Sequence, residues 1–243
     1  MKLLALYQNP LVGDKKILPR DIRNYVASIM KDYEDVHSEI MGHKSKQPTF
    51  IFSLPNKKSF AIYTFKKDKK TEMMLTLIAR VINENPKINI RGTKATVRDA
   101  FTRQRDYTNF EEGLFERRLR TPMVIAVSKM EYAQCREISK DNKIDMPKLK
   151  KFVEKQIKDS IAFTVRDWFG EEAKAEVEDI MDETIILFKD LRYLPIKFKE
   201  GKWLTAVTGT IISSVNLPQF IGYASGLGYG ELSDPSQAQR KRR

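Results

Sequence analysis

The chain has 243 residues, 41% of them hydrophobic, and it contains no run of about 18 apolar residues. This composition excludes a disordered protein and a membrane-spanning helix, and the length fits one large domain or two domains of about 100–120 residues. The formal net charge of +12 calls for a polyanionic partner, with nucleic acid the first candidate. The plainer alternative is a basic protein without a functional basic surface.

The first 92 residues follow the element order of a ferredoxin-like unit. Gln8, Asn9 and Pro10 interrupt the opening apolar run, so we expect a first strand there rather than a signal peptide. Pro19 and Gly42 bound a predicted helix, whose apolar stripe is Ile22, Val26, Ile29, Tyr33, Val36 and Ile40. The remaining predictions are two strands joined as a hairpin, a helix and a fourth strand, at residues 48–55, 59–65, 71–85 and 87–92.

The second half predicts a less regular repeat of the same order. A strand is expected at 121–128, a long helix at 146–170, a shorter acidic helix at 171–183, and strands at 184–198 and 202–215. The predicted fold class is therefore α+β, with two ferredoxin-like (RRM-like) domains in tandem and a C-terminal glycine-rich loop. The expected bounds are 1–118 for the first domain, 119–235 for the second and 236–243 for a basic tail.

Metal-binding and nucleophile motifs do not occur in the sequence. The single cysteine, Cys135, permits no intrachain disulfide and suits a reducing, cytoplasmic location. Two histidines, His37 and His43, are not spaced as a zinc pair, and neither a phosphate-binding loop nor a nucleophile elbow is present. Metal-free acid–base chemistry without a cofactor is the one catalytic option that these residues support.

The two histidines and their neighbours suit the cleavage of RNA by its own 2′-hydroxyl. His37 lies at the rim of the first predicted helix, and His43 follows it in a loop with Lys44 and Lys46. One group would take the 2′-hydroxyl proton, another would protonate the leaving 5′-oxygen, and an ammonium would stabilise the phosphorane. The alternative is that His37 is a surface or capping residue.

Basic residues concentrate in the first half of the chain. Residues 43–70 hold eight lysines and one acid, Asp68, and arginines recur through residues 91–120. Five basic residues, interleaved with Phe101 and Tyr107, suit phosphate contacts and base stacking: Arg91, Lys94, Arg98, Arg103 and Arg105. The alternative for this segment is a solvated helix face with ion pairs such as Asp99–Arg103.

The stretch LPQFIGYASGLGYGEL, residues 217–232, contains four glycines. A dinucleotide fingerprint is excluded, because Glu231 follows Gly230 and no helix or spaced acid follows. A hairpin turn and a loop that lets RNA approach both remain open. No lysine or arginine occurs from Gln219 to Gln239, so any phosphate contact there would come from backbone N–H groups or Ser225.

Taken together, these features resemble the RNA-binding superfamily of CRISPR-associated proteins, and within it the endoribonucleases that cut CRISPR precursor transcripts at each repeat. The most specific match is residues 201–232, with Leu217-Pro218, Ile221-Gly222 and Gly228-Tyr229-Gly230. The rest of the chain matches as an order of elements. The resemblance places the catalytic histidine at His37, with His43 as a second candidate, and the RNA-facing loop at Gly222, Gly226, Gly228 and Gly230.

The resemblance implies a metal-independent endoribonuclease that makes guide RNAs and leaves a 2′,3′-cyclic phosphate or 3′-phosphate. His37 would act as base or acid with His43, Tyr33 or Lys44 as its partner. The expected partners are CRISPR repeat RNA and other effector subunits, with a homodimer left open. Two alternatives remain: a guide-RNA-holding effector subunit without chemistry, and an unrelated basic nucleic-acid-binding regulator.

Overall fold

The computed structural model divides the chain into two compact units, Met1–Tyr107 with Gly226–Gly228, and the remainder from Thr108. It describes residues 1–12, 17–41, 48–56, 58–64, 66, 68–103, 110–140, 143–199 and 202–233. The expected boundary at 118 falls after β6 (Glu112–Arg118). Because β6 pairs with β9 (Lys202–Val215), residues 108–118 belong with the second unit.

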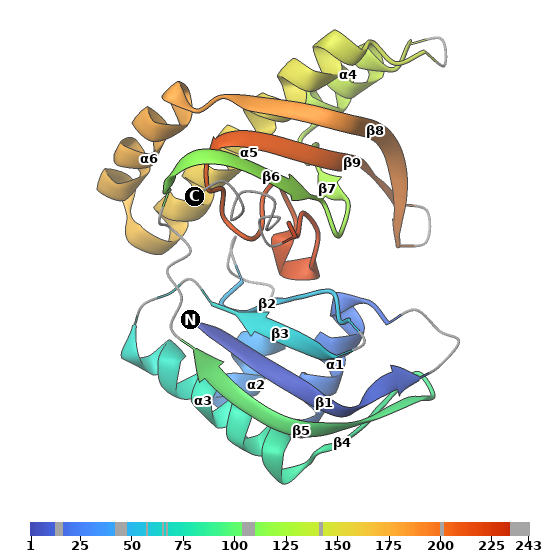
Figure 1. The fold of residues 1–243 in the computed structure, drawn as a ribbon, viewed down its shortest axis with the longest axis vertical. Helices are drawn as coiled ribbons and strands as arrows, with labels where there is room; N and C mark the ends of the chain where they lie inside the picture. Colours follow the sequence, from blue (N-terminus) through green and yellow to red (C-terminus); the bar gives the residue numbers. More distant parts are fainter. Residues whose placement is uncertain are drawn as a thin grey trace, which may run out of the picture. The chain divides into compact units, whose positions relative to one another are not determined.

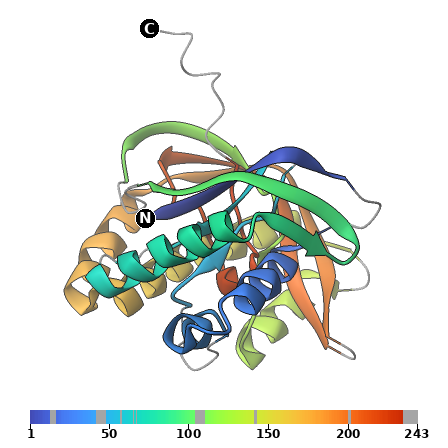
Figure 2. The same cartoon turned by 90° about the horizontal axis from the view of Figure 1, so that it is seen from below.

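The first unit is one antiparallel sheet with helices on one face (Figures 1 and 2). Its strand order is β2-β3-β1-β5-β4, the ferredoxin-like order with one strand added at the edge. The strands are β1 (Lys2–Val12), β2 (Ile51–Phe52), β3 (Ser59–Tyr63), β4 (Lys87–Ile90) and β5 (Thr93–Arg103). The helices are α1 (Pro19–Ile29), α2 (Glu34–Met41) and α3 (Lys69–Glu84).

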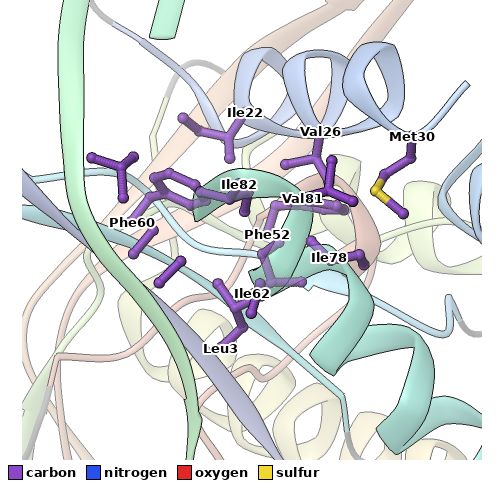
Figure 3. Close-up of a cluster of buried hydrophobic side chains, with 14 of the residues drawn as sticks. Leu3, Ile22, Val26, Met30, Phe52, Phe60, Ile62, Ile78, Val81 and Ile82 are labelled. Atoms are coloured by element: carbon purple, nitrogen blue, oxygen red, sulfur yellow. The ribbon is translucent and has the colours of Figure 1, made fainter. Parts of the chain in front are cut away.

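The core of this unit follows from residue periodicity. Leu3, Ala5 and Tyr7 point inward along β1, as alternation in a half-buried strand requires. Helix α3 is capped by Asp68, which accepts a hydrogen bond of 2.8 Å from the Thr71 N–H. Figure 3 shows residues of α1, α3 and the strands packed together in this core.

One expected helix is two helices in the structure. Helix α1 ends at Ile29 and is capped by Met30, whose N–H donates to the carbonyls of Val26 and Ala27, and α2 begins at Glu34. Met30 is fully buried, while Tyr33, expected on the apolar stripe, is 39% exposed. The regular spacing of apolar residues was therefore misleading across residues 30–33, where local turn geometry ends the first helix.

The final strand of the unit also differs from the expectation. Residues 87–90 form the edge strand β4, and β5 completes the ferredoxin-like sheet by pairing with β1. The alternative of a solvated helix over this segment, with an Asp99–Arg103 ion pair at helical spacing, is therefore wrong.

The second unit contains a shorter version of the same fold. In its sheet β9 is central, β8 (Ile186–Lys199) lies along one side, and β6 and β7 (Met123–Val124) share the other (Figure 1). The long helix α5 (Met146–Phe169) and the shorter α6 (Glu171–Glu183) are confirmed, whereas α4 (Lys129–Ile138) and β6 were not predicted. After β9, where a full unit would have its second helix, residues 216–233 form bridged segments and a short 3₁₀ turn, η2 (Ser225–Leu227). Two ferredoxin-like units in an α+β chain are thus confirmed.

None of the described helices is long and apolar enough to cross a membrane.

Candidate nucleic-acid interface

The sheet face of the first unit that lies opposite its helices carries a row of exposed basic residues. Lys94 and Arg98 project from β5, and Lys87 projects from β4, while their neighbours Ala95 and Val97 point into the core. The register pairs Lys87 with Thr96 and Asn89 with Lys94, so the basic side chains share one face. Lys87 was missed from the sequence, because its place beside Lys94 depends on the β4–β5 pairing.

A bulge in β5 exposes Arg98. The register passes from Leu6 opposite Asp99 to Tyr7 opposite Val97, so Arg98 has no partner residue on β1. Both Arg98 and Asp99 are exposed, and Ala100 returns to the core. Bulges of this kind re-aim side chains and recur beside functional sites.

Aromatic rings lie next to cations on the same face. The Arg103 guanidinium carbon is 4.9 Å from the Phe101 ring centroid, and the Lys2 Nζ is 5.1 Å from that of Tyr63. The register brings Lys2 opposite both Arg103 and Tyr63. Tyr63 is buried, so of these two pairs only Arg103 with Phe101 offers accessible guanidinium and aromatic planes, which are the elements of single-stranded RNA recognition.

Arg91 has a different environment. It occupies the left-handed region, with φ of 52°, in the turn between β4 and β5. Its guanidinium lies 3.5 Å from the carboxylate of Asp21, in the first turn of α1. This ion pair connects the β4–β5 turn to α1, while the Arg91 side chain remains 48% exposed.

The candidate catalytic residue His37 lies on α2, and Tyr33 directly precedes that helix. The His37 N–H donates to the Tyr33 carbonyl at 2.9 Å, which fixes the backbone between them. His37 is half-buried and Tyr33 is partly exposed. His43, Lys44, Lys46 and Arg105 lie outside the described residues.

A polar chain that sequence reasoning missed lies beside α2. Lys66 Nζ donates to Thr49 Oγ1 at 3.2 Å, and Thr49 Oγ1 donates to Glu39 Oε2 at 2.5 Å. Thr49 is buried, so the chain fixes an ammonium next to the helix that carries His37. Lys66 is 17 positions from Thr49, and Thr49 is 10 positions from Glu39. The sequence alone therefore does not indicate that the three residues are neighbours.

The glycines of residues 217–232 are fixed by packing. A Cβ at Gly228 would overlap Pro19, and one at Gly226 would overlap Pro48, so these two glycines pack within the first unit. Gly222 donates its N–H to Ser160 Oγ at 2.8 Å and Gly230 donates to the Pro122 carbonyl at 2.9 Å. The N–H groups of Gly222 and Gly230 thus already donate hydrogen bonds within the protein. An RNA contact in this segment would have to use the Ser225 side chain or other backbone N–H groups.

Gly230→Ala is expected to destabilise the second unit by about 2 kcal/mol or more. Gly230 has φ of +72°, and a Cβ there would overlap the Ile221 carbonyl oxygen. Gly92→Ala is the matched control, because Gly92 has a similar φ of +83° with open space around it; it should cost only about 1–2 kcal/mol. Urea unfolding of both variants measures the difference, and equal losses would contradict a packing role for Gly230.

Two arginines of the expected basic surface are structural instead. Arg117 is 4% exposed, and its guanidinium donates to the Ser233 and Leu217 carbonyls and to the side chains of Asn216 and Gln219. Arg120 lies 2.6 Å from the carboxylate of the fully buried Glu231. Of the arginines at 117, 118 and 120, only Arg118 is exposed.

Glu131 connects α4 to the glycine-rich segment. Its carboxylate accepts from the N–H groups of Val127 and Ser128 and, at 2.8 Å, from the Tyr223 hydroxyl. Burial acts to raise the pKa of Glu131, but these hydrogen bonds outweigh it, and the pKa is lowered. Burial, followed by the bond to Glu131, raises the pKa of Tyr223.

This depressed pKa predicts a pH-dependent contribution to stability. The contribution should be complete above the unfolded pKa of about 4.3 and should be lost as the pH falls through the lower folded value. Glu131→Gln should therefore lower the Tm at pH 7, and the difference in Tm between the variant and the original protein should disappear in acid. Thermal unfolding of both proteins from pH 7 to pH 2.5 tests this, and a difference in Tm that stays the same at every pH would contradict it.

Comparisons with known proteins identify the fold. No protein-family model and no curated protein sequence matches the chain. A crystal structure of Cas6b superposes with a TM-score of 0.63 at 17% identity, covering 96% of this chain and 100% of the other. A Thermus thermophilus Cas6 product complex superposes with a TM-score of 0.62 at 12% identity, covering 97% of this chain and 99% of the other. A Cas6-related protein from Pyrococcus furiosus superposes with a TM-score of 0.58 at 12% identity, covering 96% of this chain and 97% of the other.

This chain has the Cas6 fold. The likeness covers 96% to 97% of the chain, so it extends over both units. At these identities it establishes the architecture, and the chemistry has to be argued from this chain's own residues.

Proposed function

We propose that the protein is a metal-independent endoribonuclease that cuts CRISPR repeat RNA to make guide RNAs. The observation that carries the proposal is the full-length Cas6 fold, which one neighbour shows in complex with its product, combined with a basic sheet face in the first unit. Lys87, Lys94 and Arg98 would contact phosphates, and Phe101 with Arg103 would stack on bases. Arg91, Arg105, Lys46 and the glycine-rich segment with Ser225 would complete the RNA path.

The proposed reaction needs no metal ion. The 2′-hydroxyl attacks the adjacent phosphorus, the bond to the 5′-oxygen breaks, and the proton lost by the nucleophile is balanced by one given to the leaving oxygen. His37 serves as the base or acid, with Tyr33, His43 or Lys44 as partner. Lys66, held beside α2 by Thr49, is a further candidate for stabilising the charge on the phosphorane.

Incubation of the purified protein with its host's repeat RNA in excess EDTA tests the proposal. Cleavage at one position, with a 5′-hydroxyl on the downstream product, is expected. Tight binding without cleavage would favour the second candidate, a guide-RNA-holding effector subunit, which the same fold and basic face also suit. Preference for duplex DNA would overturn both.

A further inference from the structure

The β8–β9 hairpin of the second unit carries an exposed tryptophan. Lys197 on β8 lies directly opposite Trp203 on β9, so their side chains share one face of the hairpin. Trp203 is 59% exposed. Among the described residues, none hydrogen-bonds to its indole or stacks on it. Figure 1 shows β8 and β9 side by side, with β8 strongly curved.

Two further apolar residues are exposed close to the start of α4. The Ile125 N–H donates to the Thr205 carbonyl at 3.0 Å, which extends the antiparallel register of β7 and β9. The ladder ends there, because the Val127 N–H donates to Glu131 Oε2 and not to Trp203. Val127 and Met130, at the start of α4, are 54% and 70% exposed. Exposed apolar residues taken singly are ordinary, so what indicates a binding surface here is the pairing of the Trp203 indole with Lys197.

The surrounding charge favours a polyanion. From Leu191 to Val215 the sequence contains one acid, Glu200, and four basic residues: Arg192, Lys197, Lys199 and Lys202. Lys129, the first residue of α4, is also exposed. The Glu131 carboxylate already accepts from the N–H groups at the start of α4. The positive charge available to a ligand at this surface therefore comes from side chains and not from the helix N-terminus. Of these cationic side chains, the register places only Lys197 on the same face as Trp203. An exposed indole beside a lysine matches the stacking-plus-phosphate chemistry of single-strand binding.

We propose that this hairpin face binds an unpaired stretch of the substrate RNA, with a base stacked on Trp203 and Lys197 on the adjacent phosphate. The source of the RNA rests on the proposed function, whereas the stacking chemistry depends only on this surface. A base paired in a duplex has both faces covered, so the site selects single strands. None of the residues expected from the sequence to bind RNA lies on this hairpin, so it adds a second contact region.

Tryptophan fluorescence gives a direct test. The chain has two tryptophans, so Trp168→Phe leaves Trp203 as the only emitter. Titration with repeat RNA or an unstructured RNA oligonucleotide should quench its emission, and a duplex RNA of equal length should not. If Trp168→Phe fails to fold, the difference in quenching between the original protein and Trp203→Phe reports the same signal.

Binding measurements complete the test. Trp203→Ala should weaken single-stranded RNA binding about 5- to 100-fold, and Trp203→Phe should restore most of it. Leu187→Ala, an equally exposed position on β8, should change nothing. Unchanged affinity without quenching, equal quenching by duplex, or a response to anionic vesicles instead of RNA would overturn the inference. Quenching without cleavage by the original protein would reject the proposed nuclease and leave this site standing.

Discussion

Replacing Arg117 with methionine is expected to lower the free energy of unfolding by about 3–5 kcal/mol. The guanidinium donates hydrogen bonds to four acceptors, in Asn216, Leu217, Gln219 and Ser233. Methionine fills part of the volume but leaves the buried Leu217 carbonyl and the Gln219 side chain with fewer donors. Thermal and urea unfolding of the purified variant measure the loss.

Lysine and alanine variants sharpen this prediction. Arg117→Lys keeps the charge but has one nitrogen in place of a planar fork, so it should recover only part of the stability. Arg118→Ala changes the next residue, whose side chain is exposed, and should stay within about 0.5 kcal/mol of the original protein. If Arg117→Met were equally benign, the arginine would not organise residues 216–233, and its assignment to a basic RNA surface would be reopened.

Replacing His37 with alanine is expected to slow cleavage of repeat RNA about 10²- to 10⁴-fold, the usual contribution of a general acid or base. RNA affinity should change by less than about twofold, because the proposed phosphate contacts come from the β4–β5 face and not from α2. Single-turnover cleavage rates and filter binding, measured on the same preparations, separate the two effects.

Matched variants on α2 distinguish chemistry from folding. Ser38→Ala alters the adjacent exposed residue and should cleave normally. Tyr33→Phe tests whether the neighbouring hydroxyl takes part, and His43→Ala tests the second histidine. Equal loss of cleavage and binding in His37→Ala, or no loss of either, would remove His37 from the catalytic role.

The elements that the sequence predicted well are those with strong local patterns. The inward residues Leu149, Val153, Ile157 and Ile161 recur every four positions along α5, and all are at most 2% exposed. The hairpin before β3 follows from Asn56, whose side chain accepts from the N–H groups of Lys58 and Ser59. Both signals are contained within a few neighbouring residues.

The features that the sequence concealed depend on distant partners. Strand β6 is mostly exposed and exists because β9, about 100 residues later, pairs with it. No strand was predicted at β5, whose basic residues were interpreted as RNA contacts or as a solvated helix face, and its pairing with β1 depends on residues about 90 positions earlier. Burial of Arg117 requires the segment after β9, so nothing near residue 117 distinguishes it from the exposed Arg118.

The most direct test of the proposed reaction is cleavage in excess EDTA of a repeat RNA that carries a single 2′-deoxy nucleotide at the cut site. Attack by the 2′-hydroxyl predicts that this substrate binds normally and is not cut. The unmodified RNA should then give a 2′,3′-cyclic phosphate or 3′-phosphate end. Cleavage of the 2′-deoxy substrate, or cleavage that stops when EDTA is added, would contradict metal-independent attack by the 2′-hydroxyl.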